Sequence, residues 1–141
     1  MQSTSADPEL AAHLRLALAR SARRLRQEAG TDLSPTLTAA LATIERHGPL
    51  TPSELAARER VTRPTMTRVV GRLEDAALVV RAADPADGRS ALVSITPGGR
   101  ALLAEARTRK DAFLSERLDA LGPEDRATLE RAAALLEGML E

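Results

Sequence analysis

The sequence predicts a mainly α-helical fold with one small β-hairpin. Of its 141 residues, 43% are hydrophobic but only 1% are aromatic, so the core must consist of aliphatic side chains, which suit closely packed helices. Six segments carry helix-start signals or apolar residues at helical spacing. Two short runs rich in β-branched residues, at 78–81 and 91–95, flank a loop with Pro and Gly and predict the hairpin.

The first helix is expected to begin at Asp7-Pro8, an N-cap followed by proline at the first helical position, and to end near Gly30. Residues 1–6 read as a polar tail that we expect to be disordered. The helix carries an apolar stripe of four leucines, namely Leu10, Leu14, Leu18 and Leu25.

The second helix begins with the same signal, Ser34-Pro35, and Gly48-Pro49 stops it. A third helix follows a capping box, Thr51 to Glu54, and is expected to end near Arg58.

Only a few residues separate the third helix from Thr62, the expected N-cap of the fourth. Two short helices joined by so tight a turn are the signature of a helix-turn-helix, although the turn lacks the frequent Gly.

The fourth helix separates apolar from cationic residues. Its apolar positions recur with helical spacing at Met66, Val69, Val70 and Leu73. Its opposite side carries Arg, Thr and small residues, and five arginines lie between positions 58 and 72 against one acid, although the whole chain has zero net charge. Such a face favours DNA, because phosphates attract Arg and the major groove admits one helix. The DNA-binding residues expected here are Thr62, Arg63, Pro64, Thr65, Thr67, Arg68 and Arg72.

The hairpin adds a charged loop to this helix. Asp84, Asp87, Gly88 and Arg89 lie in the loop between the strands expected at Leu78–Arg81 and Ala91–Ile95. A helix for one groove followed by a basic finger for the next indicates a winged helix-turn-helix that binds double-stranded DNA, with Asp87 and Arg89 as further site residues. The alternatives are an ordinary solvated helix face and a winged domain that binds protein without specific DNA binding.

The chain is expected to end in two more helices. Thr96-Pro97 starts the fifth, whose first turn Gly98 and Gly99 should weaken. Gly122-Pro123 breaks it, and the sixth begins at about Glu124. A winged domain of about sixty residues could not cover the leucine stripes of the first and last helices, so we expect a symmetric homodimer with the terminal helices as its interface.

The chain resembles the MarR family of bacterial transcription regulators over nearly its whole length. The family pattern runs Leu-Glu, then Leu-Val-x-Arg, Asp-x-x-Asp-x-Arg, a short strand and Thr-x-x-Gly. The positions that match it are Leu73, Glu74, Leu78, Val79, Arg81, Asp84, Asp87, Arg89, Thr96 and Gly99. One departure is Ala77, where the family usually has Gly, so the end of the fourth helix is expected to differ slightly.

The resemblance implies a repressor that is an obligate dimer, with an N-terminal dimerisation helix (1–32), a winged helix-turn-helix DNA-binding domain (33–97) and C-terminal dimerisation helices (98–141). It implies that Arg89 enters a minor groove, oriented by Asp87. It also implies a crevice for a small phenolic or anionic effector. Residues expected to bind this effector are Arg20, Arg23, Arg24 and Phe113.

Other classes of protein are excluded or disfavoured. Without Cys, neither disulfides nor thiol-based sensing is possible. His13 and His47 are the only histidines, and neither has a partner at metal-ligand spacing, so we expect no metal and no other cofactor. No nucleophile or phosphate-loop motif indicates an enzyme. The chain shows no membrane span and no secretory signal, and a cytoplasmic protein is expected.

Overall fold

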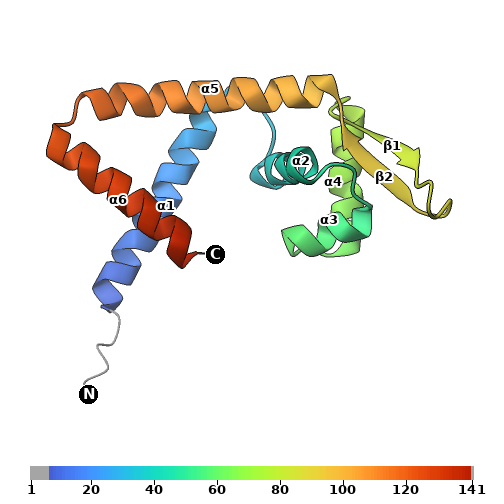
Figure 1. Ribbon diagram of the computed structural model, residues 1–141, viewed down its shortest axis with the longest axis horizontal. Helices are drawn as coiled ribbons and strands as arrows, with labels where there is room; N and C mark the ends of the chain where they lie inside the picture. The colour runs from blue at the N-terminus through green and yellow to red at the C-terminus, as the bar shows by residue number, and fades with distance from the viewer. Residues whose placement is uncertain (1–6, 141) are drawn as a thin grey trace, which may run out of the picture. The chain divides into compact units, whose positions relative to one another are not determined.

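The computed structural model describes residues 7–140, and the expected tail at 1–6 lies outside them. Within the described residues there are six helices and one antiparallel hairpin, which confirms the predicted fold class (Figure 1). The elements are α1 (Pro8–Glu28), α2 (Pro35–His47), α3 (Pro52–Glu59), α4 (Arg63–Asp75), β1 (Val79–Ala83), β2 (Ala91–Ile95), α5 (Pro97–Asp119) and α6 (Pro123–Met139).

The chain forms two compact units. The central unit is Ala29–Arg107, and the terminal unit combines Met1–Glu28 with Thr108–Glu141. Helix α5 contributes its first part to the central unit and its second part to the terminal unit.

The starts of α2, α3 and α4 follow the capping signals of the sequence. The side chains of Ser34, Thr51 and Thr62 each accept a hydrogen bond from the backbone N–H three residues later, at 3.2, 3.1 and 3.3 Å. Each helix also has Pro in its first turn, where no hydrogen bond is lost. The cap at Thr62 fixes the residue at which α4 begins.

The core of the central unit is aliphatic, as the composition predicts. Helix α4 buries the apolar positions expected from its spacing, Met66, Val69, Val70 and Leu73. They pack in one cluster with residues of α2, α3 and the hairpin, among them Leu41, Ile44, Leu55 and Val93. Burying this stripe turns the arginine-bearing side of α4 toward solvent.

Two residues other than Gly adopt the left-handed conformation at helix ends. Arg60 ends α3 with φ 54° and ψ 43°, and so takes the place of the Gly that is frequent in such turns. Ala77 follows α4 with φ 60°. The expectation that Ala77 alters the end of this helix is therefore wrong in one respect: Ala keeps the conformation that Gly favours, at an energetic cost.

The hairpin pairs Val79 with Ile95 at one end and Ala83 with Ala91 at the other. Its first strand is Val79–Ala83 rather than the expected Leu78–Arg81, because the Leu78 N–H bonds to the carbonyl of Leu73 and closes the end of α4.

A bridge between Leu50 and Val93, which the sequence did not predict, ties the α2–α3 connection to the hairpin. The two residues exchange backbone hydrogen bonds of 3.1 and 2.8 Å. Beside α4 the hairpin extends its loop away from the helices (Figure 1).

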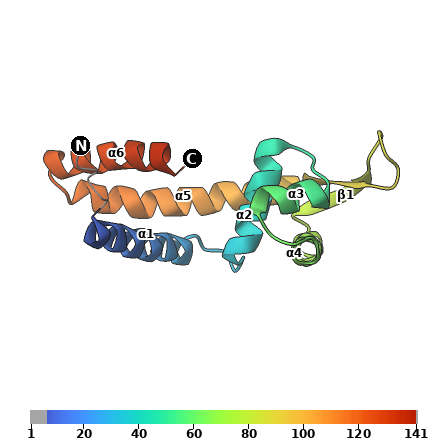
Figure 2. The same cartoon turned by 90° about the horizontal axis from the view of Figure 1, so that it is seen from below.

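The terminal unit leaves much apolar surface uncovered. Figure 2 shows α1 on one side of α5 and α6 on the other. Neither α1 nor α6 contains a buried residue. Large side chains such as Leu10 (54% exposed), Leu135 (67%) and Met139 (64%) face solvent. Among the helices of residues 7–140, none has the length and apolar character needed to cross a membrane.

Candidate nucleic-acid interface

The predicted site residues on α4 gather on its outer side. Thr62, Arg63, Pro64, Thr67, Arg68 and Arg72 are exposed, and Thr65 is half-buried. Gly71 lies among them, and a Cβ added there would meet no atom within 4 Å. This side is therefore open to a partner along the whole helix.

The arginines of this surface are not held in ion pairs in the part of the chain that the structure describes. Within residues 7–140, Arg63, Arg68, Arg72 and Arg89 form no ion pair with a carboxylate. Arg81 differs, because it bonds Glu74 at 2.5 Å and thereby links β1 to the end of α4. The unpaired guanidiniums are available to phosphates or base edges.

A chain of hydrogen bonds prepares the first turn of α4. The Thr62 hydroxyl donates to Oγ1 of Thr65 at 2.9 Å, and Nη2 of Arg68 donates to the same oxygen at 3.5 Å. The Thr65 oxygen accepts twice, so its own hydrogen is free to be donated outward. The chain orients Arg68 while leaving most of its N–H groups unused.

Thr67 is arranged differently. Its hydroxyl donates to the backbone carbonyl of Arg63 at 3.0 Å, inside the helix. The hydroxyl hydrogen is thus already used, and the methyl group is better suited to an apolar contact, such as a thymine methyl.

The hairpin loop is shaped by its two aspartates. Oδ1 of Asp87 accepts the backbone N–H of Arg89 at 3.0 Å, and Oδ2 accepts the Ser90 hydroxyl at 3.4 Å. Oδ1 of Asp84 accepts the N–H of Ala86 at 2.9 Å. Asp87 therefore acts on Arg89 through the main chain of the loop, which the residue types alone did not indicate.

A polar groove joins the hairpin loop to the helices. Its volume is about 480 Å³, and Arg63, Asp87 and Arg89 line it together with the first turn of α3. The structure thus brings the wing residues and the start of α4 to one surface.

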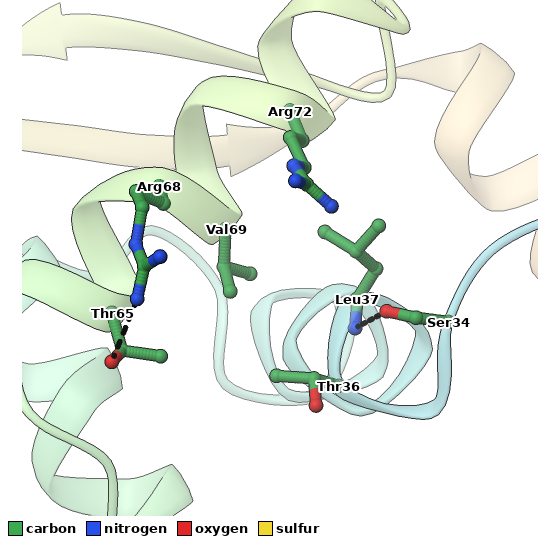
Figure 3. A pocket seen from close by; sticks show the side chains of 7 residues that line it. All are labelled: Ser34, Thr36, Leu37, Thr65, Arg68, Val69 and Arg72. Atoms are coloured by element: carbon green, nitrogen blue, oxygen red, sulfur yellow. Dashed lines mark hydrogen bonds between the residues drawn. The ribbon is translucent and has the colours of Figure 1, made fainter.

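A smaller cavity lies beside α4. It has a volume of about 200 Å³ and lies between α4 and the start of α2 (Figure 3). Thr65, Arg68, Val69 and Arg72 line it from α4, and Ser34, Thr36 and Leu37 from α2. Sequence reasoning missed the α2 residues, because Ser34 served only as a helix-start signal and positions 35–62 separate it from α4. The available signal was the pair of hydroxyl groups on Ser34 and Thr36, on either side of Pro35.

Three of the four candidate effector residues share one cavity in the terminal unit. Arg20, Arg24 and Phe113 line a space of about 410 Å³, whereas Arg23 is not among its lining residues. Cζ of Arg117 lies 3.4 Å from the centroid of the Phe113 ring, and Cζ of Arg24 lies 5.0 Å from it. Arg24 also pairs with Glu28 at 2.9 Å.

A helix-turn-helix with an unpaired cationic outer face, flanked by a charged hairpin, defines a DNA-binding protein of the winged helix-turn-helix class. The MarR family model matches residues 33–91. An uncharacterized HTH-type transcriptional regulator of Mycobacterium bovis is 40% identical over 136 residues, which cover 96% of this chain and 95% of the relative. A regulator of Mycobacterium leprae shows the same identity and coverage. The chain belongs to the MarR family of transcriptional regulators, and homologues of this kind are regulators rather than enzymes.

Solved structures agree with this assignment. A protein of Pseudomonas aeruginosa PA01 described as a transcriptional regulator superposes with a TM-score of 0.88 at 36% identity, covering 98% of each chain. A Staphylococcus aureus MepR mutant, solved bound to an oligodeoxyribonucleotide, has a TM-score of 0.72 at 18% identity and covers 94% of this chain and 98% of its own. At this low identity, the likeness to MepR shows only that the two chains share a fold.

Proposed function

We propose that this regulator is a repressor that binds an inverted-repeat operator as a symmetric homodimer. The observation that carries the proposal is the set of arginines on α4 and the hairpin loop that have no carboxylate partner within residues 7–140. Charges kept unpaired on one exposed surface match the phosphate backbone of a duplex.

The contacts divide between the two grooves. Helix α4 enters the major groove, where Arg68, oriented by Thr65, pairs with a guanine edge. Arg63 and Arg72 bind phosphates on either side. The wing reaches the neighbouring minor groove with Arg89, whose backbone Asp87 holds.

The exposed apolar side chains of the terminal unit support the dimer. Leu10 and Leu18 on α1, and Leu129, Leu135 and Met139 on α6, are each 40% exposed or more. Large apolar side chains exposed in such number favour an interface, and a second copy supplies a matching surface. A two-fold dimer places its α4 helices about one DNA turn apart, so the half-sites lie ~10 bp apart from centre to centre.

A small anionic or phenolic effector releases the dimer from DNA in this proposal. The cavity around Phe113 supports it, because Arg20 and Arg117 bring positive charge to a partly apolar space of about 410 Å³. A ligand weakens DNA binding only to the extent that it prefers an arrangement of the protein that DNA does not. Benzoate and salicylate are suitable probes, read out as a rise in melting temperature and as release of bound DNA.

The experiment that tests the function is a titration of labelled DNA from upstream of the protein's own gene, with a scrambled duplex of equal length and composition as control. We expect the upstream DNA to bind at least a thousandfold more tightly at physiological salt. Binding to neither duplex would favour the alternative function, a winged module that binds protein.

A further inference from the structure

The cavity between α4 and the start of α2 has a composition that is unusual for an apolar packing defect. Two of its seven lining residues are arginines, and three carry hydroxyl groups. In Figure 3, Arg72 extends from α4 toward Leu37 of α2, whereas Arg68 extends toward Thr65 on its own helix. Arginines of α4 and hydroxyl-bearing residues of both elements thus line one space of about 200 Å³.

The hydroxyl groups differ in what they can offer. Oγ of Ser34 accepts the N–H of Leu37 at 3.2 Å and is needed to cap α2. Thr36 is exposed, and no hydrogen bond of its hydroxyl occurs within the described residues. Thr36 is therefore the α2 side chain in this cavity whose hydroxyl hydrogen is unused and whose hydroxyl caps no helix.

The arginines are likewise available. Arg72 is exposed and forms no ion pair within residues 7–140, and Arg68 uses a single N–H toward Thr65. Thr36 and Arg72 line one space, and a guanidinium together with a hydroxyl that can turn toward it is a donor set for a phosphate or another oxyanion.

We propose that this cavity binds one backbone phosphate of the operator in each protomer, with Thr36 of α2 and Arg72 of α4 as its direct ligands. Arg68 lies at the same cavity and adds positive charge, while its remaining donors read a base. The inference rests on the proposed function and adds α2 to the DNA-binding surface. A phosphate bound by residues of both α2 and α4 fixes how deeply α4 enters the groove, because the DNA backbone then contacts α4 and the neighbouring helix at one point.

The test uses the full-length protein and five variants, with affinities for operator and scrambled duplexes measured over a range of chloride concentrations. Thr36→Val should weaken binding to both duplexes by roughly tenfold, since a hydrogen bond to a charged group is lost. It should leave the salt slope unchanged, because it removes no charge. Thr36→Ser should restore affinity, and Thr38→Val on the same helix, outside the cavity, should behave as the wild type.

Arg72→Gln should also weaken binding to both duplexes. The slope of log affinity against log salt concentration should fall by about 2 for a dimer, roughly 0.9 for each lost phosphate contact. Combined with Thr36→Val, it should cost less than the product of the single effects, because both residues hold the same phosphate.

Each outcome has a separate meaning. Suppose that the wild type discriminates between the duplexes and that Thr36→Val binds both as the wild type does. This result would overturn the inference and leave the proposed function standing. If the losses of affinity from Thr36→Val and Arg72→Gln simply multiplied in the double variant, the two residues would contact different phosphates. That result would also overturn the inference. If inorganic phosphate displaced DNA far better than chloride at equal ionic strength, and only with Thr36 and Arg72 intact, the cavity would be a site for free anions instead. A wild type that binds neither duplex would refute both proposals.

Discussion

The close contact between α5 and the hairpin makes Gly99 a sensitive test of the packing. A Cβ added to Gly99 would lie 2.4 Å from the carbonyl oxygen of Leu78 and 2.7 Å from Cγ1 of Ile95. An ordinary carbon–oxygen contact is about 3.3–3.6 Å, so the substitution Gly99→Ala would require a displacement of about 1 Å. The same carbonyl accepts the N–H of Thr96 at 3.0 Å, and Thr96 caps the start of α5 by accepting the Gly99 N–H at 3.0 Å.

The expected size of the effect follows from three terms. Overpacking costs roughly 1–3 kcal/mol, and disturbing the hydrogen bonds of Thr96 adds about 1 kcal/mol. The better helix propensity of Ala returns about 1 kcal/mol. Gly99→Ala should therefore lower the free energy of unfolding by roughly 2 kcal/mol, and the melting temperature by roughly 4–8 °C.

The adjacent Gly98 provides the matched control. A Cβ there would meet its nearest atoms, Oγ1 of Thr96 and the carbonyl oxygen of Ala77, at 3.6 and 3.7 Å, which are ordinary contacts. Gly98→Ala should therefore stabilise the protein by up to about 1 kcal/mol. The assay is thermal unfolding followed by circular dichroism at one fixed chain concentration, since the proposed dimerisation makes melting concentration-dependent. If Gly99→Ala were as stable as Gly98→Ala, the described packing of α5 on Leu78 and Ile95 would be refuted.

Four further predictions concern the DNA surface and the end of α4. Arg68→Ala should weaken operator binding by roughly 1–3 kcal/mol and affect random DNA less, as measured by fluorescence anisotropy; equal losses on both would show that Arg68 contacts only phosphate. Arg89→Ala should reduce affinity most for operators with A·T-rich flanks, where the minor groove is narrow, and an unchanged affinity and salt slope would exclude Arg89 from the interface. Asp87→Ala should have a milder effect of the same kind, because it loosens the Arg89 backbone. Ala77→Gly should raise the free energy of unfolding by about 0.5–1 kcal/mol, since it relieves a positive φ of 60°, whereas Ala76→Gly, at φ −84°, should lower it; urea unfolding that ranks the two in the opposite order would contradict the assignment of strain to Ala77.

The sequence was most informative where structure is local. The starts of α2, α3 and α4 depend on a cap residue and a proline within one turn, and Ser34, Thr51 and Thr62 bear out the expected caps. The buried stripe of α4 could be predicted because its spacing depends only on the helical period.

Features that depend on distant segments could not be predicted in the same way. The bridge from Leu50 to Val93 joins residues more than forty positions apart, and neither residue carries a signal for it. Gly99 was expected only to weaken a helix, yet the structure shows that its missing side chain makes room for Leu78. Thr36 carries no signal of its own in the sequence, and only the fold places it in the lining of the same cavity as Arg72. The contacts of the predicted site residues with DNA remain predictions.

The central claim is that two copies of this chain bind one inverted repeat through α4 and the hairpin loop. The most direct measurement is the mass of the complex by sedimentation, together with its affinity, for the full-length protein and for a chain lacking residues 1–25. We predict two full-length chains on each inverted repeat and tight binding only when both half-sites are present, with the shortened chain failing to dimerise and losing this preference. A full-length protein that stays monomeric at micromolar concentration, or that binds a single half-site as tightly as the inverted repeat, would contradict the account.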